Sequence, residues 1–271
     1  MTSSPIPAAA EDAIRVLDAL RSGNPLVHCM TNIVVAGFTA NVLLAVGASA
    51  AMVENAEESA EFAKIAGALL VNLGTLSPDK VSAMRLAVMA AKASGTPWVL
   101  DPVAVGVLAY RTRFATSLLS ESPTIIRGNA SEILSLAGVA NSAGRGVEST
   151  ANSQNALAHA CNFARQQESI VALSGAVDYI TDGIQTIEVR NGDPIMTRVT
   201  GVGCALGALI AACAAVEPSP LIAASAGTTI LTVAAEIAVK ESSGSGSFAV
   251  GLLDALYGLD ASAIRRQLST N

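Results

Sequence analysis

The chain has 271 residues, of which 51% are hydrophobic but only 3% aromatic, so its core has to be built from Ala, Val, Leu and Ile. A net charge of −6 argues against a nucleic-acid partner, because proteins that bind nucleic acid present basic surfaces to the phosphates. The mean hydropathy of +0.50 is high for a monomer and indicates a buried subunit interface in an oligomer.

The first half of the chain predicts helices that alternate with strands. Residues Met1–Glu11 lack the basic region and the long apolar core of a secretory signal. In chain order, periodicity and apolar runs then predict helices at Glu11–Arg21 and Val34–Val46, a strand at Ala68–Leu73, a helix at Pro78–Ala93 with Ser77 as its N-cap, and strands at Trp98–Leu100 and Thr124–Ile126.

The second half continues the alternation and ends in apolar helices. It predicts a helix that begins near Ser131, a helix at Asn152–Gln167, short strands at Ile170–Leu173, Asp178–Thr181 and Gln185–Val189, and helices at Cys204–Val216, Leu221–Ser242 and Phe248–Tyr257. The stretch 204–239 is very apolar, but Glu217, Pro218 and Pro220 interrupt it. We therefore expect buried helices rather than a membrane span.

No Pro-rich or Ser-rich linker divides the chain, so we expect residues 1–271 to form one α/β domain. Repeated strand-then-helix units imply a mostly parallel central sheet flanked by helices. In such sheets the functional site lies beyond the carboxyl ends of the strands. The four cysteines show no CxxC spacing, which suggests neither a zinc site nor a disulfide framework and fits a reducing cytoplasm.

The sharpest motif is the glycine-flanked start of a late helix, at Val199–Leu206. The backbone amides of Gly201, Val202, Gly203 and Cys204, together with the helix dipole, would form an anion hole for a phosphate group. A glycine-rich turn that merely enters a helix is the alternative. The pattern GxGxxxG is not the dinucleotide fingerprint, and no GxxxxGK[ST] loop occurs.

Cys204 lies at the start of that helix, where the dipole is expected to lower the pKa of its thiol. A thiolate there could accept a proton from a substrate hydroxyl. The alternative is a small buried apolar residue, which is the commoner role of a free cysteine.

Polar residues follow two other predicted strands. Asp101 comes after one strand, and Arg127 and Glu132 come after the next. Arg127 could hold a phosphate, and Glu132 could orient Mg²⁺ through water. The alternatives are a turn residue for Asp101 and a helix cap formed by Asn129 and Glu132.

Near the N-terminus, Asn32 could hydrogen-bond a polar heterocycle and Met52 could supply adaptable apolar contact. A capping role for Asn32 and a core role for Met52 are the alternatives. We expect His28 to be structural.

Six segments, in this order, resemble the hydroxyethylthiazole kinase family: VHCMTNIVVAGFTAN from Val27, GASAAM from Gly47, LDPVAVG from Leu100, IIRGNASEI from Ile125, GRGVES from Gly144 and VTGVGCALGALIAA from Val199. The resemblance implies a ribokinase-like three-layer fold without a separate lid domain. Gly201–Cys204 is similar to the GxGD anion hole of ribokinase-like enzymes, with Cys in place of the usual Asp.

The resemblance also implies an activity, ATP-dependent phosphorylation of the hydroxyl of 4-methyl-5-(2-hydroxyethyl)thiazole in thiamine biosynthesis. Residues carried over by position have four implied roles: Mg²⁺ and phosphate at Asp101 and Glu132, ATP at Arg127 and Ser174, thiazole alcohol at Asn32, Met52 and Gly201, and catalysis at Cys204. A cytoplasmic homotrimer with sites between subunits is implied as well. Gly37 and Ala50 stand where Asn and Pro are common, so the thiazole pocket can differ in shape.

Two other functions remain open from the residues alone. A related kinase could phosphorylate a hydroxymethylpyrimidine, although Cys204 and the Thr31–Val35 segment disfavour it. A protein that binds thiazole or nucleotide without catalysis is the second. A dehydrogenase and a hydrolase are weaker, because the fingerprint and a GxSxG motif are lacking.

Overall fold

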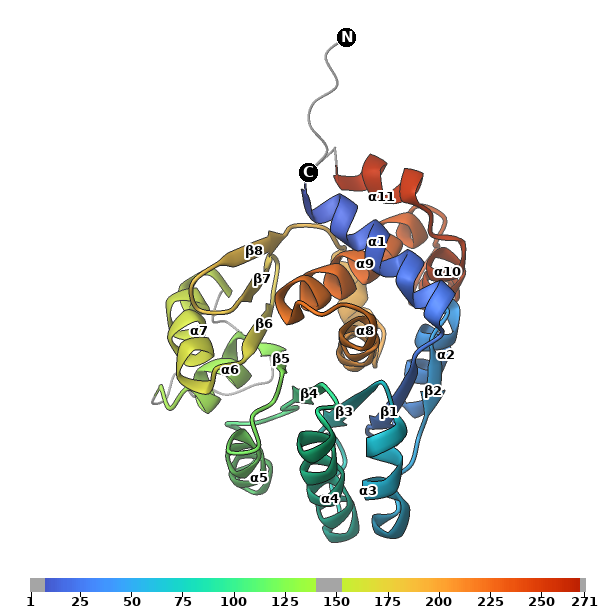
Figure 1. Cartoon of the computed structure of the whole chain (residues 1–271). Coiled ribbons are helices and arrows are strands. Elements are labelled where there is room, and N and C mark those ends of the chain that lie inside the picture. Colours follow the sequence, from blue (N-terminus) through green and yellow to red (C-terminus); the bar gives the residue numbers. More distant parts are fainter. Residues whose placement is uncertain (1–7, 140–152, 269–271) are drawn as a thin grey trace.

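The computed structural model describes residues 8–139 and 153–268, and its strands form one continuous sheet (Figure 1). The strands are β1 (Leu26–Met30), β2 (Ser49–Ala51), β3 (Ala68–Asn72), β4 (Trp98–Asp101), β5 (Ile125–Asn129), β6 (Ile170–Ser174), β7 (Asp178–Thr181) and β8 (Thr186–Val189). Their order across the sheet is β2-β1-β3-β4-β5-β6-β7-β8. Neighbours from β2 to β6 run parallel, and β7 is antiparallel to both β6 and β8.

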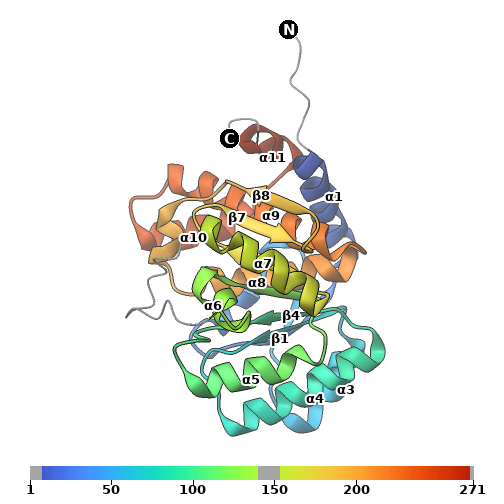
Figure 2. The ribbon, with the colours of Figure 1, turned by 90° about the vertical axis from the view of Figure 1, so that its left-hand side faces the viewer.

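Helices cover both faces of this sheet (Figures 1 and 2). One layer contains α1 (Ala8–Gly23), α2 (Ala36–Val46), α8 (Val202–Val216), α9 (Pro220–Lys240), α10 (Ser245–Gly258) and α11 (Ala261–Leu268). The other layer contains α3 (Ala56–Ile65), α4 (Pro78–Ser94), α5 (Ala109–Leu119), α6 (Ala130–Leu136) and α7 (Ser153–Gln167). The expected three-layer α/β fold with a mostly parallel sheet is confirmed.

Alternate strand residues divide the interior into two cores. In β3, Ala68 and Leu70 pack in the core beside α8 and α9, whereas Leu69 and Val71 pack in the core beside α4. Successive side chains of a strand point to opposite faces, so covering both faces buries every residue. This explains why β3 reads as an unbroken apolar run.

The apolar helices α8 and α9 lie inside the molecule. Helix α9 is long and apolar enough to cross a membrane, but 78% of its apolar window is buried among other helices. Its start is well defined, because the Ser219 hydroxyl accepts the Ile222 N–H (3.4 Å) and Pro220 occupies the first turn. The expected pair of buried helices is confirmed.

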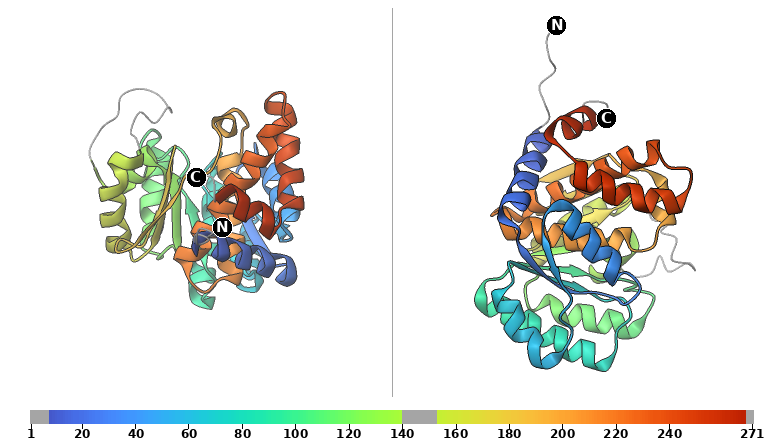
Figure 3. Two further views of the ribbon diagram at one scale, coloured as in Figure 1. Left: turned by 90° about the horizontal axis from the view of Figure 1, so that it is seen from above. Right: turned by 90° about the vertical axis from the view of Figure 1, so that its right-hand side faces the viewer.

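The first and last described helices lie side by side (Figures 1 and 3). Arg265 of α11 pairs with Glu11 of α1, with 2.9 Å between Nε and Oε1. Arg21 near the end of α1 donates to the carbonyl of Leu259, which follows α10 (2.7 Å). These contacts fasten the C-terminal helices over the start of the chain.

Several elements differ from the sequence-based expectations. β1 was not predicted, and neither were β2, α3, α5, α11 and the short 3-10 helix η1 (Pro194–Arg198). The strand expected to end at Ile126 continues to Asn129, so Arg127 lies within β5. Ser77 caps α4 as expected, accepting the Lys80 N–H (3.2 Å). The segment GRGVES, from Gly144, lies outside the described residues.

Candidate functional site

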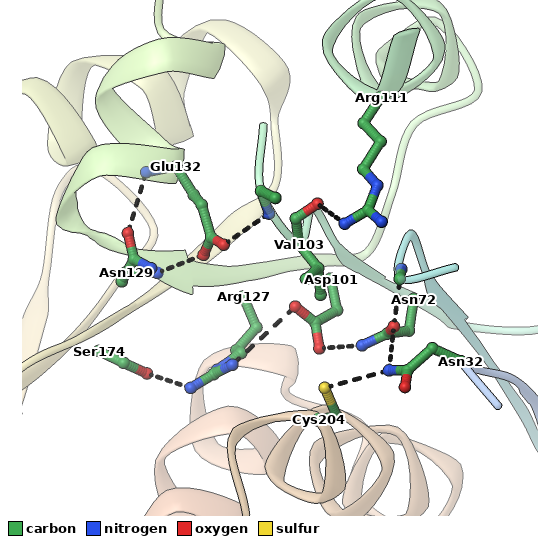
Figure 4. A network of polar contacts seen from close by, with 12 residues as sticks. Asn32, Asn72, Asp101, Val103, Arg111, Arg127, Asn129, Glu132, Ser174 and Cys204 are labelled. Carbon is green, nitrogen blue, oxygen red and sulfur yellow. Dashed lines mark hydrogen bonds and ion pairs between the residues drawn. The ribbon is translucent and has the colours of Figure 1, made fainter. Parts of the chain in front are cut away.

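Polar side chains meet where the parallel strands end, facing the start of α8 (Figure 4). Asn72 ends β3 and lies beside Asp101, which ends β4. Asn129 ends β5 and lies beside Ser174, which ends β6. Because neighbouring strands are in parallel register, four chain segments far apart in sequence deliver their last residues to one edge of the sheet.

A chain of side-chain amides runs across this edge. Asn72 donates its Nδ2–H to Asp101 Oδ2 (2.6 Å) and accepts at Oδ1 from Asn32 Nδ2 (3.0 Å). The same Asn32 nitrogen lies 3.5 Å from Cys204 Sγ. Asn32, Asp101 and Cys204, each predicted from the sequence, are therefore joined, and Asn72 lies between them (Figure 4).

Arg127 connects Asp101 to Ser174. Its Nη1 lies 3.9 Å from Asp101 Oδ1, and its Nη2 donates to Ser174 Oγ (3.0 Å). The guanidinium also lies against the start of α8, because a Cβ placed on Gly203 would come within 3.1 Å of Nη1. Glycine at position 203 thus lets a cation approach the positive end of the helix, where an anion would be held between them.

The start of α8 has the geometry that an anion hole needs. Gly201 is its N-cap and has a φ of +94°, a left-handed conformation that favours glycine. A Cβ at this position would also lie 2.8 Å from Val35 Cγ1. The first amides of a helix lack partners within it, so those that follow Gly201 can donate to a ligand.

Glu132 forms the helix cap that the sequence offered as the alternative to a metal role. Its Oε2 accepts the Asn129 N–H (2.9 Å) and its Oε1 accepts the Ala104 N–H (3.0 Å), while Asn129 Oδ1 accepts the Glu132 N–H (3.1 Å). Each carboxylate oxygen keeps one further lone pair. The cap fastens the loop after β4 to the start of α6 and leaves Glu132 able to accept from a water.

Burial controls the protonation of the two acids beside α8. The pKa of Asp101 is raised to about 7, mainly by burial and also by Glu132, whereas Arg127 and the amide of Asn72 act to lower it. Burial is also the main cause that raises the pKa of the Cys204 thiol, and Asp101 adds to it. The expected lowering of the Cys204 pKa is therefore wrong, because burial and the neighbouring carboxyl of Asp101 raise it more than Asn72, Arg127 and Asn32 lower it.

A cavity of about 580 Å³ opens beside Arg127 and Ser174. Its walls come from the ends of β5 and β6, the segment that contains η1, and the first turn of α8. Among the described residues that line it, Arg127 is the one basic side chain. The volume and the mainly apolar walls with a few convergent polar groups are typical of small-molecule sites.

Two residues of the site escaped the sequence analysis, Asn72 and Asp178. Asp178 lines the cavity and accepts the Gly175 N–H (2.9 Å); burial raises its pKa to about 6, against the lowering effects of that N–H and of Arg127. Asp178 opens a predicted strand and Asn72 lies within one, so both read as strand residues. A polar residue inside an apolar run was the available signal.

Met52 has the fewest contacts with the other predicted site residues. It follows β2 at the same edge of the sheet and packs, half-buried, against the core beside α2. Within residues 8–139 and 153–268 it makes no hydrogen bond with the other predicted residues. His28 is buried and its Nε2 contacts the Val53 carbonyl (2.7 Å), and its structural role stays a prediction.

Comparison with known proteins identifies the family. A family model described as "HK: Hydroxyethylthiazole kinase family" matches residues 17–262. The chain belongs to the hydroxyethylthiazole kinase family. It is 52% identical over 267 residues to the hydroxyethylthiazole kinase of Granulibacter bethesdensis, covering 98% of this chain and 97% of the relative. The hydroxyethylthiazole kinase of Leptospira borgpetersenii is 51% identical, covering 91% and 93%.

Structural alignment with solved proteins supports both the assignment to the hydroxyethylthiazole kinase family and the fold. The hydroxyethylthiazole kinase from Pyrococcus horikoshii OT3 aligns with a TM-score of 0.87 at 39% identity, covering 94% of this chain and 96% of that one. A ribokinase-like superfamily protein from Enterococcus faecalis V583 aligns with a TM-score of 0.63 at 13% identity, covering 94% and 91%. The fold is therefore ribokinase-like, as the resemblance implied.

Proposed function

We propose that this chain transfers the γ-phosphoryl group of ATP to the primary alcohol of 4-methyl-5-(2-hydroxyethyl)thiazole, giving the thiazole phosphate and ADP. The observation that carries this proposal is the convergence of Arg127, Ser174 and the first amides of α8 on one cavity. Relatives about half identical to it over nearly their whole length are named for this kinase activity.

The site has two sides that meet at the start of α8. On the cavity side, Arg127 and Ser174 would hold the ATP phosphates. On the other side, Asn32 and Met52 would hold the thiazole alcohol, with Gly201 beneath it. Phosphoryl transfer needs mainly positioning and stabilisation of spread negative charge, so the amides at Gly201–Cys204 would carry the electrostatic part.

Cys204 lies between the two sides and would orient the alcohol. Burial and Asp101 raise the pKa of its thiol, so at neutral pH it is protonated and is a weak base. A protonated thiol can still accept a weak hydrogen bond from the hydroxyl and exclude water from it. The loose transition state of such transfers makes little demand on a strong base.

Two acidic side chains that interact with each other, Asp101 and Glu132, support a Mg²⁺ site near Arg127. Asp101 Oδ1 is buried and accepts no hydrogen bond within the described residues, with Arg127 at 3.9 Å. No cluster of three or more His, Cys, Asp and Glu occurs in residues 8–139 and 153–268. This suits Mg²⁺, which keeps several waters and takes few protein ligands. Asp101 and Glu132 would hold its water shell, and the ion would neutralise charge on the phosphates.

We further propose a cytoplasmic homotrimer of one-domain subunits with the thiazole side between subunits. Ile33 and Val34, directly after Asn32, are 77% and 64% exposed. Leu44 on α2 is 60% exposed, and Tyr257 on α10, which packs against α2, is 78% exposed. Apolar exposure that begins at the site and continues along α2 supports a subunit contact there.

A coupled assay of ADP release, with and without the thiazole alcohol, tests the activity. We expect ATP consumption that requires both Mg²⁺ and the thiazole alcohol. Hydroxymethylpyrimidine serves as the matched acceptor. ADP release with the pyrimidine alone, or tight calorimetric binding of the thiazole alcohol without ADP release, would contradict the proposal.

A further inference from the structure

We propose that Asn72 is the positioning residue that joins the alcohol-binding side of the site to its phosphate-binding side. The proposal deepens the function above and rests on it. Asn72 is completely buried at the end of β3. Its side chain contacts Asn32, Asp101 and the backbone of Gly74, so one amide connects groups from three strand ends and the following loop (Figure 4).

The orientation of the Asn72 amide is decided by a backbone group. The Gly74 N–H donates to Asn72 Oδ1 (3.0 Å), and a backbone N–H can only donate. The oxygen must therefore face Gly74, which turns Nδ2 toward the Asp101 carboxyl. The loop is tight at this point, since a Cβ on Gly74 would lie 2.6 Å from the Cβ of Asn32.

On the phosphate side, this orientation determines which oxygen of Asp101 stays available. Asn72 occupies Asp101 Oδ2 (2.6 Å), and Oδ1 is left facing Arg127. Gly207 of α8 allows this placement, because a Cβ there would come within 3.3 Å of Oδ2. Without the Asn72 donor, a buried carboxyl would lose its one full hydrogen bond within the described residues and could rotate.

On the alcohol side, Asn72 orients Asn32. The Asn32 Nδ2 is held by Asn72 Oδ1 and by Cys204 Sγ, so its donor group is used. Its carbonyl oxygen Oδ1 accepts no hydrogen bond in the part of the chain that the structure describes, and it can receive the hydroxyl proton of an alcohol. Asn72 therefore sets the position of the acceptor alcohol and of the carboxyl beside the phosphates together.

Two substitutions separate these two tasks. Asn72→Asp keeps an acceptor for Asn32 and Gly74 but removes the donor to Asp101 and places a second carboxyl against it. Asn72→Ala removes both. We expect kcat to fall about 10- to 100-fold in both variants, as for other groups that orient reactive residues. We expect the KM for the thiazole alcohol to rise about tenfold in Asn72→Ala only.

The KM for ATP serves as an internal reference, because Asn72 does not line the cavity beside Arg127. It should change less than about threefold in both variants. Calorimetry with the thiazole alcohol alone, without nucleotide or metal, gives a readout independent of turnover. Binding should weaken in Asn72→Ala and stay close to wild type in Asn72→Asp.

Asn162→Ala is the matched control, because Asn162 is an exposed asparagine on α7 that contacts only Arg165 by hydrogen bond among the described residues. It should leave all parameters unchanged. If Asn72 had a purely structural role, kcat would fall in proportion to the folded fraction and both KM values would stay unchanged. Circular dichroism measures the folded fraction. That result would overturn the proposal. Failure of the wild-type protein to phosphorylate the alcohol would instead overturn the proposed function.

Discussion

Asp101 and Cys204 lie next to each other at the start of α8, and burial in the protein raises the pKa of both. The two groups are coupled, because a negative charge on the Asp101 carboxylate or on the Cys204 thiolate raises the free energy of ionising the other group. Arg127 is the cation that offsets them. At the residue scale, this balance leads to two predictions.

Replacing Cys204 by alanine should slow the enzyme about tenfold in kcat without abolishing activity, because a protonated thiol positions the alcohol but is a poor base. Cys204→Ser, which keeps a hydrogen-bonding group, should retain more activity than the alanine variant. Steady-state kinetics of the two variants measure this. Complete loss of activity in folded Cys204→Ala would show that the thiol carries the proton.

The ligand-free protein should lose the stability that protonated Asp101 contributes as pH rises from about 4 to 7, and Asp101→Asn should not show this loss. Asp101 has a pKa of about 7 in the folded state against an ordinary value near 3.8, so in this range the folded chain keeps a proton that the unfolded chain releases. The free energy of unfolding gained by Asp101→Asn should therefore grow between pH 4 and 7, by up to about 4 kcal/mol.

Urea unfolding of both proteins at pH 4.5 and 7.5 measures this change. Asp178, whose pKa is raised to about 6, contributes to the pH dependence of both proteins equally and cancels in the comparison. An Asp101→Asn effect that is the same at both pH values would show that Asp101 ionises freely in the folded protein.

At the scale of elements, helix α8 positions the site, because its first turn lies against the polar side chains. It crosses the core beside β3 and β4, and its first turn approaches Arg127 and Asp101 through glycines 203 and 207. A helix packed on all sides cannot tilt to admit a larger residue, so substitutions in this turn must displace the side chains that face it.

Gly203→Ala should raise the KM for ATP about tenfold while leaving the fold intact. The added methyl group would lie 3.1 Å from Arg127 Nη1, which is tighter than an ordinary contact, so the guanidinium has to move away from the helix. Gly246→Ala on α10 is the control, since a Cβ there meets nothing within 4 Å. Kinetics with ATP as the varied substrate test this, and unchanged affinity for ATP would contradict it.

Patterns along the chain predicted the elements that are apolar and long, such as β3, α8 and α9, because both faces of those elements are buried. They missed β2, which has three half-buried residues, and α3, whose acidic residues hide its buried face. β1 contains His28, whose imidazole packs edge-on against Phe62 of α3, a contact that local sequence does not reveal.

The site was predictable where a residue follows a recognisable strand, as with Asp101, or a glycine motif, as with Cys204. Asn72 was not, because its importance comes from the register that pairs it with Asp101 on a neighbouring strand. The hydrogen bond from the Ala104 N–H to the Glu132 carboxylate could not be predicted from the sequence either, because Ala104 lies in a loop that is distant along the chain.

For the whole molecule, two cores share one sheet, and the two edges of that sheet differ in the exposed apolar side chains near them. Leu44 and the segment Ile33–Val34 belong to the part of the chain next to β2, the edge strand of the parallel region. The opposite edge, formed by β7 and β8, carries the isolated exposed residue Ile184. This asymmetry gives a test of assembly.

Leu44→Glu should shift the protein from trimer to monomer and reduce activity at least tenfold, because a charge in an apolar contact has to be desolvated on association. Ile184→Glu, an equally drastic change on the other edge of the sheet, should affect neither property. Light scattering after size-exclusion chromatography, combined with the ADP-release assay, measures both. A fully active Leu44→Glu monomer would rule out shared sites.

The charges around Arg127 have a consequence for how the enzyme takes up its substrates. Asp101 and Asp178, which both interact with this arginine, have pKa values of about 7 and 6, so the vacant protein at neutral pH stores fractional protons on them. Any multivalent cation that arrives with a nucleotide favours the ionised carboxylates and drives those protons into solution. We therefore expect nucleotide uptake at this site to release protons, so that its measured heat will depend on the ionisation enthalpy of the buffer.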